Sequence, residues 1–118
     1  MSTRNLAQDV LFVLLPPEPD LCAELKRLNE QVSTKCDFHV IVDFSRVEII
    51  TSPGISNLLI LRKWLKGAGR RLILCGVRFA TKCVFKLAAL DTVFEFAEDK
   101  DAALAALGAD APVTAPTS

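Results

Sequence analysis

Few side chains of this sequence could carry covalent chemistry. The chain holds one histidine, His39. A β-rich apolar run stops abruptly at Thr51-Ser52-Pro53-Gly54, where hydroxyl side chains precede a proline and a glycine. His39 lies inside the alternating stretch FHVIVDF, which is typical of a strand, so it is poorly placed to act as the base for a serine or cysteine nucleophile. Gly-rich phosphate loops and the HExxH and EF-hand spacings are absent from the sequence. We therefore expect a protein that is not an enzyme.

The cysteines predict neither a metal site nor a redox pair. The spacings of Cys22, Cys36, Cys75 and Cys83 fit no zinc pattern and no CxxC motif. Three of the four lie in strongly apolar periodic segments, so we expect reduced core residues, no metal and no cofactor. The alternative is a small enzyme with Cys75 or Cys83 as nucleophile, which would need a depressed thiol pKa and a neighbouring base.

The hydroxyl of Ser52 has two interpretations. Serine is a preferred helix N-cap and proline a preferred first helical residue, so Ser52 followed by Pro53 fits a plain helix start. In an open α/β sheet, however, functional groups gather where strands end and helices begin, because free backbone N–H groups and the positive end of the helix lie there. Local rules favour capping without excluding a second role.

The helix expected after Ser52 has two distinct faces. One face carries an apolar stripe that is expected to pack on the sheet, formed by Gly54, Leu58, Leu61 and Leu65. The other face continues from Ser52 in steps of three and four, and we interpret it as a partner-binding surface. Ordinary exposed surface is the alternative. The residues of this expected partner-binding surface are Ile55, Ser56, Leu59, Arg62 and Lys63.

An alternating series of strands and helices places these residues. Periodicity predicts strands at residues 10–15, 38–44, 72–77 and 93–96, and helices at 20–32, 54–66, 81–90 and 99–107. Four successive strand–helix units predict an α/β fold, with a mainly parallel sheet of four to five strands and covering helices. We expect an N-terminal tail over residues 1–8, one domain over 9–107 and a disordered C-terminal tail over 108–118.

Charge and hydropathy narrow the kind of partner. The 14 basic and 14 acidic residues give a formal net charge of zero, so no overall field favours nucleic acid or an anionic membrane. No run approaches the ~20 apolar residues of a membrane span, and the N-terminus lacks the pattern of a signal peptide. We expect a cytoplasmic protein that recognises a protein partner through a local surface, without nucleic acid and without membrane insertion.

Residues 38–107 resemble the STAS family, the domain shared by sulfate transporters and bacterial anti-sigma factor antagonists. DFS at residues 43–45 is similar to the Asp-Leu-Ser-like turn of the family, and TSPG at residues 51–54 is similar to its Asp-Ser-Ser-Gly-like motif. LILCGV at residues 72–77 resembles the family's LVLVG-like strand, and ALD at residues 89–91 with Phe94 resembles its GLD..F segment.

The resemblance implies a bacterial regulator of transcription, an anti-sigma factor antagonist or anti-anti-sigma factor. In such antagonists a hydroxyl residue of the Asp-Ser-Ser-Gly-like motif is phosphorylated by an anti-sigma factor with serine kinase activity, and only the unphosphorylated form captures that factor. The resemblance makes Ser52 the first candidate for the phosphorylated residue and Thr51 the second. Asp43 and Gly54 would shape the turn that presents them.

A second function fits the same resemblance. Thr51 and Pro53 stand where the family has Asp and Ser, which favours a STAS binding subunit or scaffold that is not phosphorylated. Such proteins include the small subunit bound to the ATPase of a lipid-transport system and the scaffolds of stress-signalling assemblies. A homodimer is a further alternative for the partner.

Overall fold

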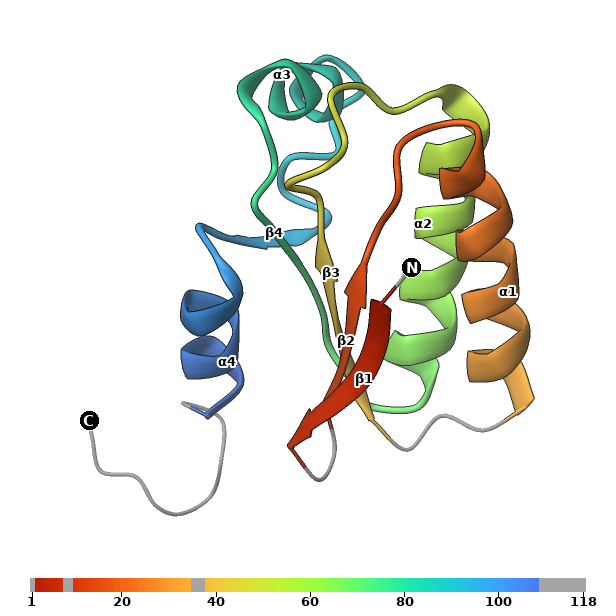
Figure 1. The fold of residues 1–118 in the computed structure, drawn as a ribbon, viewed down its shortest axis with the longest axis vertical. Helices are drawn as coiled ribbons and strands as arrows, with labels where there is room; N and C mark the ends of the chain where they lie inside the picture. Colours follow the sequence, from red (N-terminus) through yellow and green to blue (C-terminus); the bar gives the residue numbers. More distant parts are fainter. Residues whose placement is uncertain (1, 8–9, 35–37, 109–118) are drawn as a thin grey trace.

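One five-stranded sheet forms the centre of the computed structural model, which describes residues 2–7, 10–34 and 38–108 (Figure 1). The strands are β1 (Ser2–Ala7), β2 (Val10–Leu14), β3 (His39–Asp43), β4 (Leu72–Cys75) and β5 (Glu95–Ala97), and they pair in this order across the sheet. β1 runs antiparallel to β2, and β2 to β5 are parallel to one another. The expected α/β fold with a mainly parallel sheet is confirmed.

β1 corrects the expectation of a tail over residues 1–8. Its sequence, STRNLA, has neither an apolar run nor regular alternation, so the sequence by itself does not indicate a strand. In the structure it pairs with the edge of β2, where Thr3 lies opposite Val13 and Asn5 opposite Leu11. The pairing satisfies backbone groups of β2 that would otherwise form a free sheet edge. The tail expected over residues 108–118 lies outside the described residues, except for Gly108, which ends a helix.

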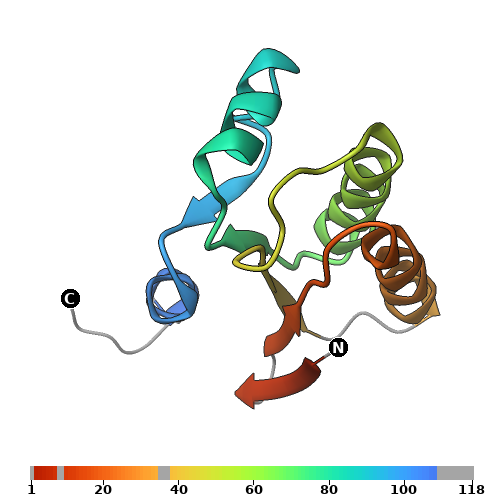
Figure 2. The ribbon, with the colours of Figure 1, turned by 45° about the horizontal axis from the view of Figure 1, so that its top comes forward.

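Four helices surround the sheet in this part of the chain. α1 (Asp20–Thr34) and α2 (Ser52–Gly67) lie side by side on one face, and α4 (Lys100–Gly108) covers the other (Figure 1). α3 (Phe79–Leu87) lies beyond the carboxyl ends of the parallel strands (Figure 2). Both α1 and α2 begin at that same end, so the start of α2 and the start of α3 belong to one end of the molecule.

The sheet separates two apolar clusters because alternate side chains of a strand point to opposite faces. On the face of α1 and α2 the buried strand residues are Leu11, Val13, Val40, Val42, Leu72 and Leu74. On the face of α4 the buried cluster consists of Val10, Phe12, Ile41, Ile73, Cys75, Ala103 and Leu107. Burial on both faces explains why β2, β3 and β4 read as nearly continuous apolar runs.

Packing between α1 and α2 fixes the position of α2. The apolar stripe expected from the sequence is buried as predicted, and Asn57 is buried beside it. The side-chain amide of Asn29 on α1 donates to the carbonyl of Asn57 at 3.1 Å, and the Asn57 amide donates to the carbonyl of Pro53 at 2.9 Å. These two hydrogen bonds connect α1 to the first turn of α2.

Candidate partner-binding site at the start of α2

A tight turn follows β3 and begins the loop that leads to α2. Asp43 ends β3, and its Oδ1 accepts the backbone N–H of Ser45 at 2.7 Å, which is an Asx turn. Gly76 lies against this turn with a φ of 65°, and an added Cβ there would come within 3.0 Å of Asp43 Oδ1. The turn therefore needs both the carboxylate of Asp43 and the bare backbone of Gly76.

Thr51, not Ser52, is the N-cap of α2. Thr51 has extended backbone angles, φ −93° and ψ 169°, and its carbonyl accepts the N–H of Ile55 at 3.0 Å. Ser52 is the first helical residue and Pro53 the second. The interpretation of Ser52 as the cap is thus wrong, because Ser52 already belongs to the helix, which begins two residues before the predicted range of 54–66. The Thr51 side chain makes no capping hydrogen bond to the helix.

The side chain of Thr51 bonds instead to Glu18, from the loop between β2 and α1. Oε2 of Glu18 accepts the hydroxyl of Thr51 at 2.5 Å and its backbone N–H at 3.3 Å. The same oxygen accepts the thiol of Cys22 at 3.7 Å. Burial and this hydrogen bond to Glu18 raise the pKa of the Cys22 thiol. A carboxylate at the start of a helix is also favourable toward the helix dipole.

Sequence analysis missed Glu18. The loop and the α2 start are 33 residues apart, and only the tertiary structure brings them together. The one signal in the sequence was an acidic residue between prolines in PPEPD, at residues 16–20.

The hydroxyl of Ser52 is exposed and makes no hydrogen bond to any residue of the described ranges. Ser56, Leu59 and Lys63 follow it on α2 and are exposed, at spacings of three and four residues that place them on one side of a helix. Leu59 is 37% exposed. Ile55 is half-buried and packs against the core, so it contributes only its edge to this surface.

Arg62 lies apart from the other four residues of the expected partner-binding surface. It is half-buried, and its Nε–H donates to the carbonyl of Val93 at 3.0 Å, just before β5. Its guanidinium lines a cleft at the other end of α2. The structure therefore brings together Ser52, Ile55, Ser56, Leu59 and Lys63 on one flank of α2, and directs Arg62 elsewhere.

Two exposed apolar side chains beside the start of α2 gave no sequence signal. Ile49, in the loop before α2, is 60% exposed, and Phe79, the first residue of α3, is 81% exposed. Ile49 lies between the predicted strand at residues 38–44 and the predicted helix at residues 54–66, and Phe79 precedes the predicted helix at residues 81–90. Large exposed apolar residues beside a polar rim are features of interaction surfaces.

α3 is held against the loop that carries Ile49. Thr81 donates its hydroxyl to the carbonyl of Glu48 at 3.1 Å. Arg78 donates from Nε and Nη2 to the carbonyl of Ser45, at 3.2 and 2.9 Å. A hollow of about 380 Å³ opens beside this junction, lined by Pro17, Glu18, Arg46, Glu48, Ile49 and Arg78. The hollow thus joins the loop before α1, the loop before α2 and the residue before α3, at the end of the molecule where α2 begins.

The chemistry available at this surface is hydrogen bonding and apolar contact. No group of three or more His, Cys, Asp or Glu side chains within the described ranges could hold a metal ion. Cys75 is fully buried, and burial, followed by the carboxylates of Asp43 and Asp99, raises the pKa of its thiol to about 12. A thiol of this kind is protonated near neutral pH, which removes Cys75 as a nucleophile. No helix in the described ranges is both long and apolar enough to cross a bilayer.

Comparison with known proteins identifies the family. The model of the STAS domain matches residues 8–103. BtrV of Bordetella bronchiseptica, which is named provisionally as an anti-sigma factor antagonist, is 26% identical over 87 residues that span 71% of this chain and 75% of BtrV.

Two solved structures share the fold. A STAS domain protein from Planctomyces limnophilus, described as an anti-sigma factor antagonist, superposes with a TM-score of 0.77 at 21% identity, over 90% of this chain and 96% of that one. Phosphorylated SpoIIAA, described as a Bacillus cell fate determinant, superposes with a TM-score of 0.69 at 14% identity, over 90% and 97%. At these identities the likeness concerns the fold.

Proposed function

The chain belongs to the STAS domain family, and we propose that it is an anti-sigma factor antagonist-like regulator that binds an anti-sigma factor through the surface around the start of α2. The observation that carries the proposal is the exposed hydroxyl of Ser52 beside the exposed apolar side chains of Leu59 and Ile49. The name of the relative BtrV supports the same class of partner. A cytoplasmic location follows from this role.

We further propose that Ser52 is the phosphorylated residue. The hydroxyl of Thr51 is engaged by Glu18, whereas the hydroxyl of Ser52 is exposed at the first position of α2. A phosphoryl group there adds about 1.5 to 2 negative charges at pH 7. In the free protein the charge is stabilised by water and by the positive helix end. Docking would bury this charge beside Leu59, which is unfavourable, so the phosphorylated form would release the partner.

The same geometry supports a second candidate function, a STAS binding subunit or scaffold that docks without phosphorylation. Pro53 has no backbone N–H, so a phosphoryl group on Ser52 would lack one of the donors that a helix start normally offers. The Glu18 carboxylate is bonded to the neighbouring Thr51 and would repel a second anion. Both features lower the benefit of phosphorylation while leaving the docking surface intact.

Phosphorylation with a purified anti-sigma factor kinase distinguishes the two functions. The protein is incubated with the serine kinase of the same organism and ATP, and the phosphate is located by mass spectrometry. A switch requires phosphate on Ser52, its loss in Ser52→Ala and its retention in the control Thr92→Ala, which removes an exposed hydroxyl between α3 and β5. Stable binding of the kinase without phosphate on Ser52 or Thr51 would contradict the switch. Absence of both binding and phosphate would contradict the antagonist function and favour the scaffold function, whose partner is another protein.

A further inference from the structure

A basic cleft lies at the end of α2 remote from Ser52. It has a volume of about 260 Å³ and opens between the C-terminal half of α2 and the beginnings of β4 and β5. Its charged lining consists of Arg62, Lys66, Arg70, Arg71 and Glu95. Buried Leu72 and Phe94 supply apolar lining.

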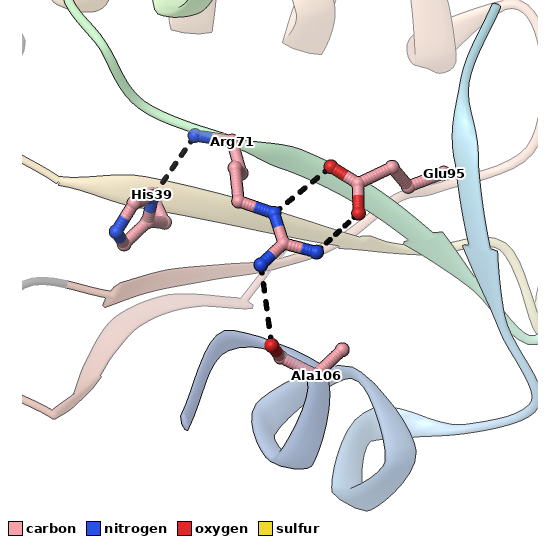
Figure 3. A network of polar contacts seen from close by, with 4 residues as sticks. All are labelled: His39, Arg71, Glu95 and Ala106. Carbon is pink, nitrogen blue, oxygen red and sulfur yellow. Dashed lines mark hydrogen bonds and ion pairs between the residues drawn. The ribbon is translucent and has the colours of Figure 1, made fainter. Parts of the chain in front are cut away.

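Glu95, the one carboxylate among the described residues of this lining, is already paired. Figure 3 shows Glu95 facing the guanidinium of Arg71, whose Nε donates to Glu95 Oε2 at 3.0 Å and whose Nη2 donates to Oε1. Nη1 of Arg71 donates to the carbonyl of Ala106 on α4 at 3.2 Å, and the Arg71 N–H donates to Nδ1 of His39 at 2.9 Å. Arg71 is thus fixed by three elements, and Glu95 is neutralised before any ligand arrives.

The guanidinium of Arg62 is also held in position, and it keeps N–H groups that can donate to a ligand. The Nε of Arg62 bonds to the carbonyl of Val93, which sets the plane of its guanidinium, and its Nη atoms make no hydrogen bond within the described part of the chain. Holding a cation in place before binding reduces the side-chain entropy that a ligand must overcome. Lys66 adds a further positive charge in the last turn of α2.

Cationic side chains outnumber carboxylates among the described residues that line the cleft, although the chain as a whole has a formal net charge of zero. Four cationic side chains line it against one carboxylate. The helix dipole accounts for a cation near the end of α2, such as Lys66, but not for Arg71, which directly precedes β4, or for Arg62 on the preceding turn of α2. Charges of one sign gathered over low-dielectric apolar groups raise the local concentration of oppositely charged ligands.

We propose that this cleft binds a phosphate-bearing group. Guanidinium groups match the geometry of phosphate oxygens through paired N–H donors, and Lys66 adds a point charge. The volume suits a small anion better than the flat surface of a folded protein. The group is carried either by a soluble phosphate ester or by a lipid headgroup, and both present the same chemistry to Arg62 and Lys66. This binding does not depend on the proposed role of Ser52.

Titration with inorganic pyrophosphate tests the proposal. At about 150 mM salt, where weak surface attraction is screened, we expect saturable NMR shifts of the backbone amides of Lys66 and Leu72. Lys66→Glu is expected to weaken binding by about tenfold or more. Lys86→Glu on α3 makes the same change of charge away from the cleft and is the matched control. Circular dichroism of both variants shows whether they remain folded.

A vesicle-binding experiment distinguishes the lipid headgroup from the soluble phosphate ester. Binding to phosphatidic acid vesicles that requires Lys66 and competes with pyrophosphate would assign a lipid headgroup. Pyrophosphate binding without vesicle binding would assign a soluble ester. Three results would overturn the proposal. These are the absence of saturable pyrophosphate shifts, an equal weakening of pyrophosphate binding in Lys86→Glu and Lys66→Glu, and amide shifts that a polyglutamate peptide causes but pyrophosphate does not.

Discussion

Replacement of Gly54 by alanine should destabilise the protein, although alanine is the better helix former. An added Cβ at Gly54 would lie 2.8 Å from Cγ1 of Ile50 and 3.0 Å from Cδ2 of Leu21. Both neighbours are buried, so neither can move without disturbing the core between α1 and α2. Overpacking of this kind costs about 1–3 kcal/mol, while the gain in helix propensity is at most about 1 kcal/mol. We expect a net loss of about 1–2 kcal/mol in the free energy of unfolding.

The same helix offers a matched control for Gly54→Ala. An added Cβ at Gly67 meets no heavy atom within 4 Å, so Gly67→Ala should be neutral or slightly stabilising. Urea unfolding can be followed by the fluorescence of Trp64, the only tryptophan. In an Ile50→Ala background the cost of Gly54→Ala should shrink, because the nearest atom is gone. Equal effects of Gly54→Ala and Gly67→Ala would refute the close packing of Gly54 against Ile50 and Leu21.

Three further predictions concern the loop contact, a buried thiol and the exposed tryptophan. Thr51→Val removes the hydroxyl that Glu18 accepts and should lower the free energy of unfolding by about 1 kcal/mol in urea titrations. In a Glu18→Ala background, which lacks the acceptor, this loss should shrink, and an equal loss in both backgrounds would contradict the contact. Because the pKa of Cys75 is raised to about 12, its thiol stays protonated at pH 8. Site-resolved mass spectrometry should therefore find iodoacetamide on the partly exposed Cys83 but not on Cys75 until the protein is unfolded. Labelling of Cys75 in the folded protein would contradict its burial. Trp64 is 44% exposed, so Trp64→Ala should cost about 1–2 kcal/mol by thermal unfolding, less than the loss from a fully buried tryptophan.

The buried strands and the two covering helices could be predicted because burial on both faces leaves a simple pattern. The runs of β2 and β4 are apolar throughout, β3 is apolar between His39 and Asp43, and α2 shows its stripe at helical spacing. β1 could not be predicted, because its strand conformation depends on pairing with β2 and not on its own composition. β5 is only three residues long, and its position shifted from the predicted residues 93–96 to Glu95–Ala97.

Only the part of the candidate site that lies on α2 could be predicted from the sequence. Ser52 and Leu59 could be placed on one flank of α2 because helical periodicity is a local property. The contact of Glu18 with Thr51 could not be foreseen, since it joins a loop and a helix start across 33 residues. Phe79 was missed because α3 begins two residues before the predicted start at residue 81. Tertiary contacts, not propensity, set these features.

The Glu18 contact gives the start of α2 a fixed geometry that a docking partner would meet preformed. Its carboxylate bonds to the backbone N–H and the hydroxyl of Thr51, so the residue before Ser52 has little freedom. A fixed surface loses less conformational entropy on binding than a mobile one. This stabilisation serves a switch and a constitutive scaffold equally.

Calorimetric titration of an anti-sigma factor kinase from the same organism into wild type, Ser52→Glu and Gln31→Glu tests the docking surface most directly. Gln31 is exposed near the end of α1 remote from Ser52, so Gln31→Glu adds the same charge outside the proposed interface. We expect tight binding of the wild type, unchanged affinity for Gln31→Glu and an affinity for Ser52→Glu reduced by about tenfold or more. Equal affinities of Ser52→Glu and wild type would contradict docking at the start of α2.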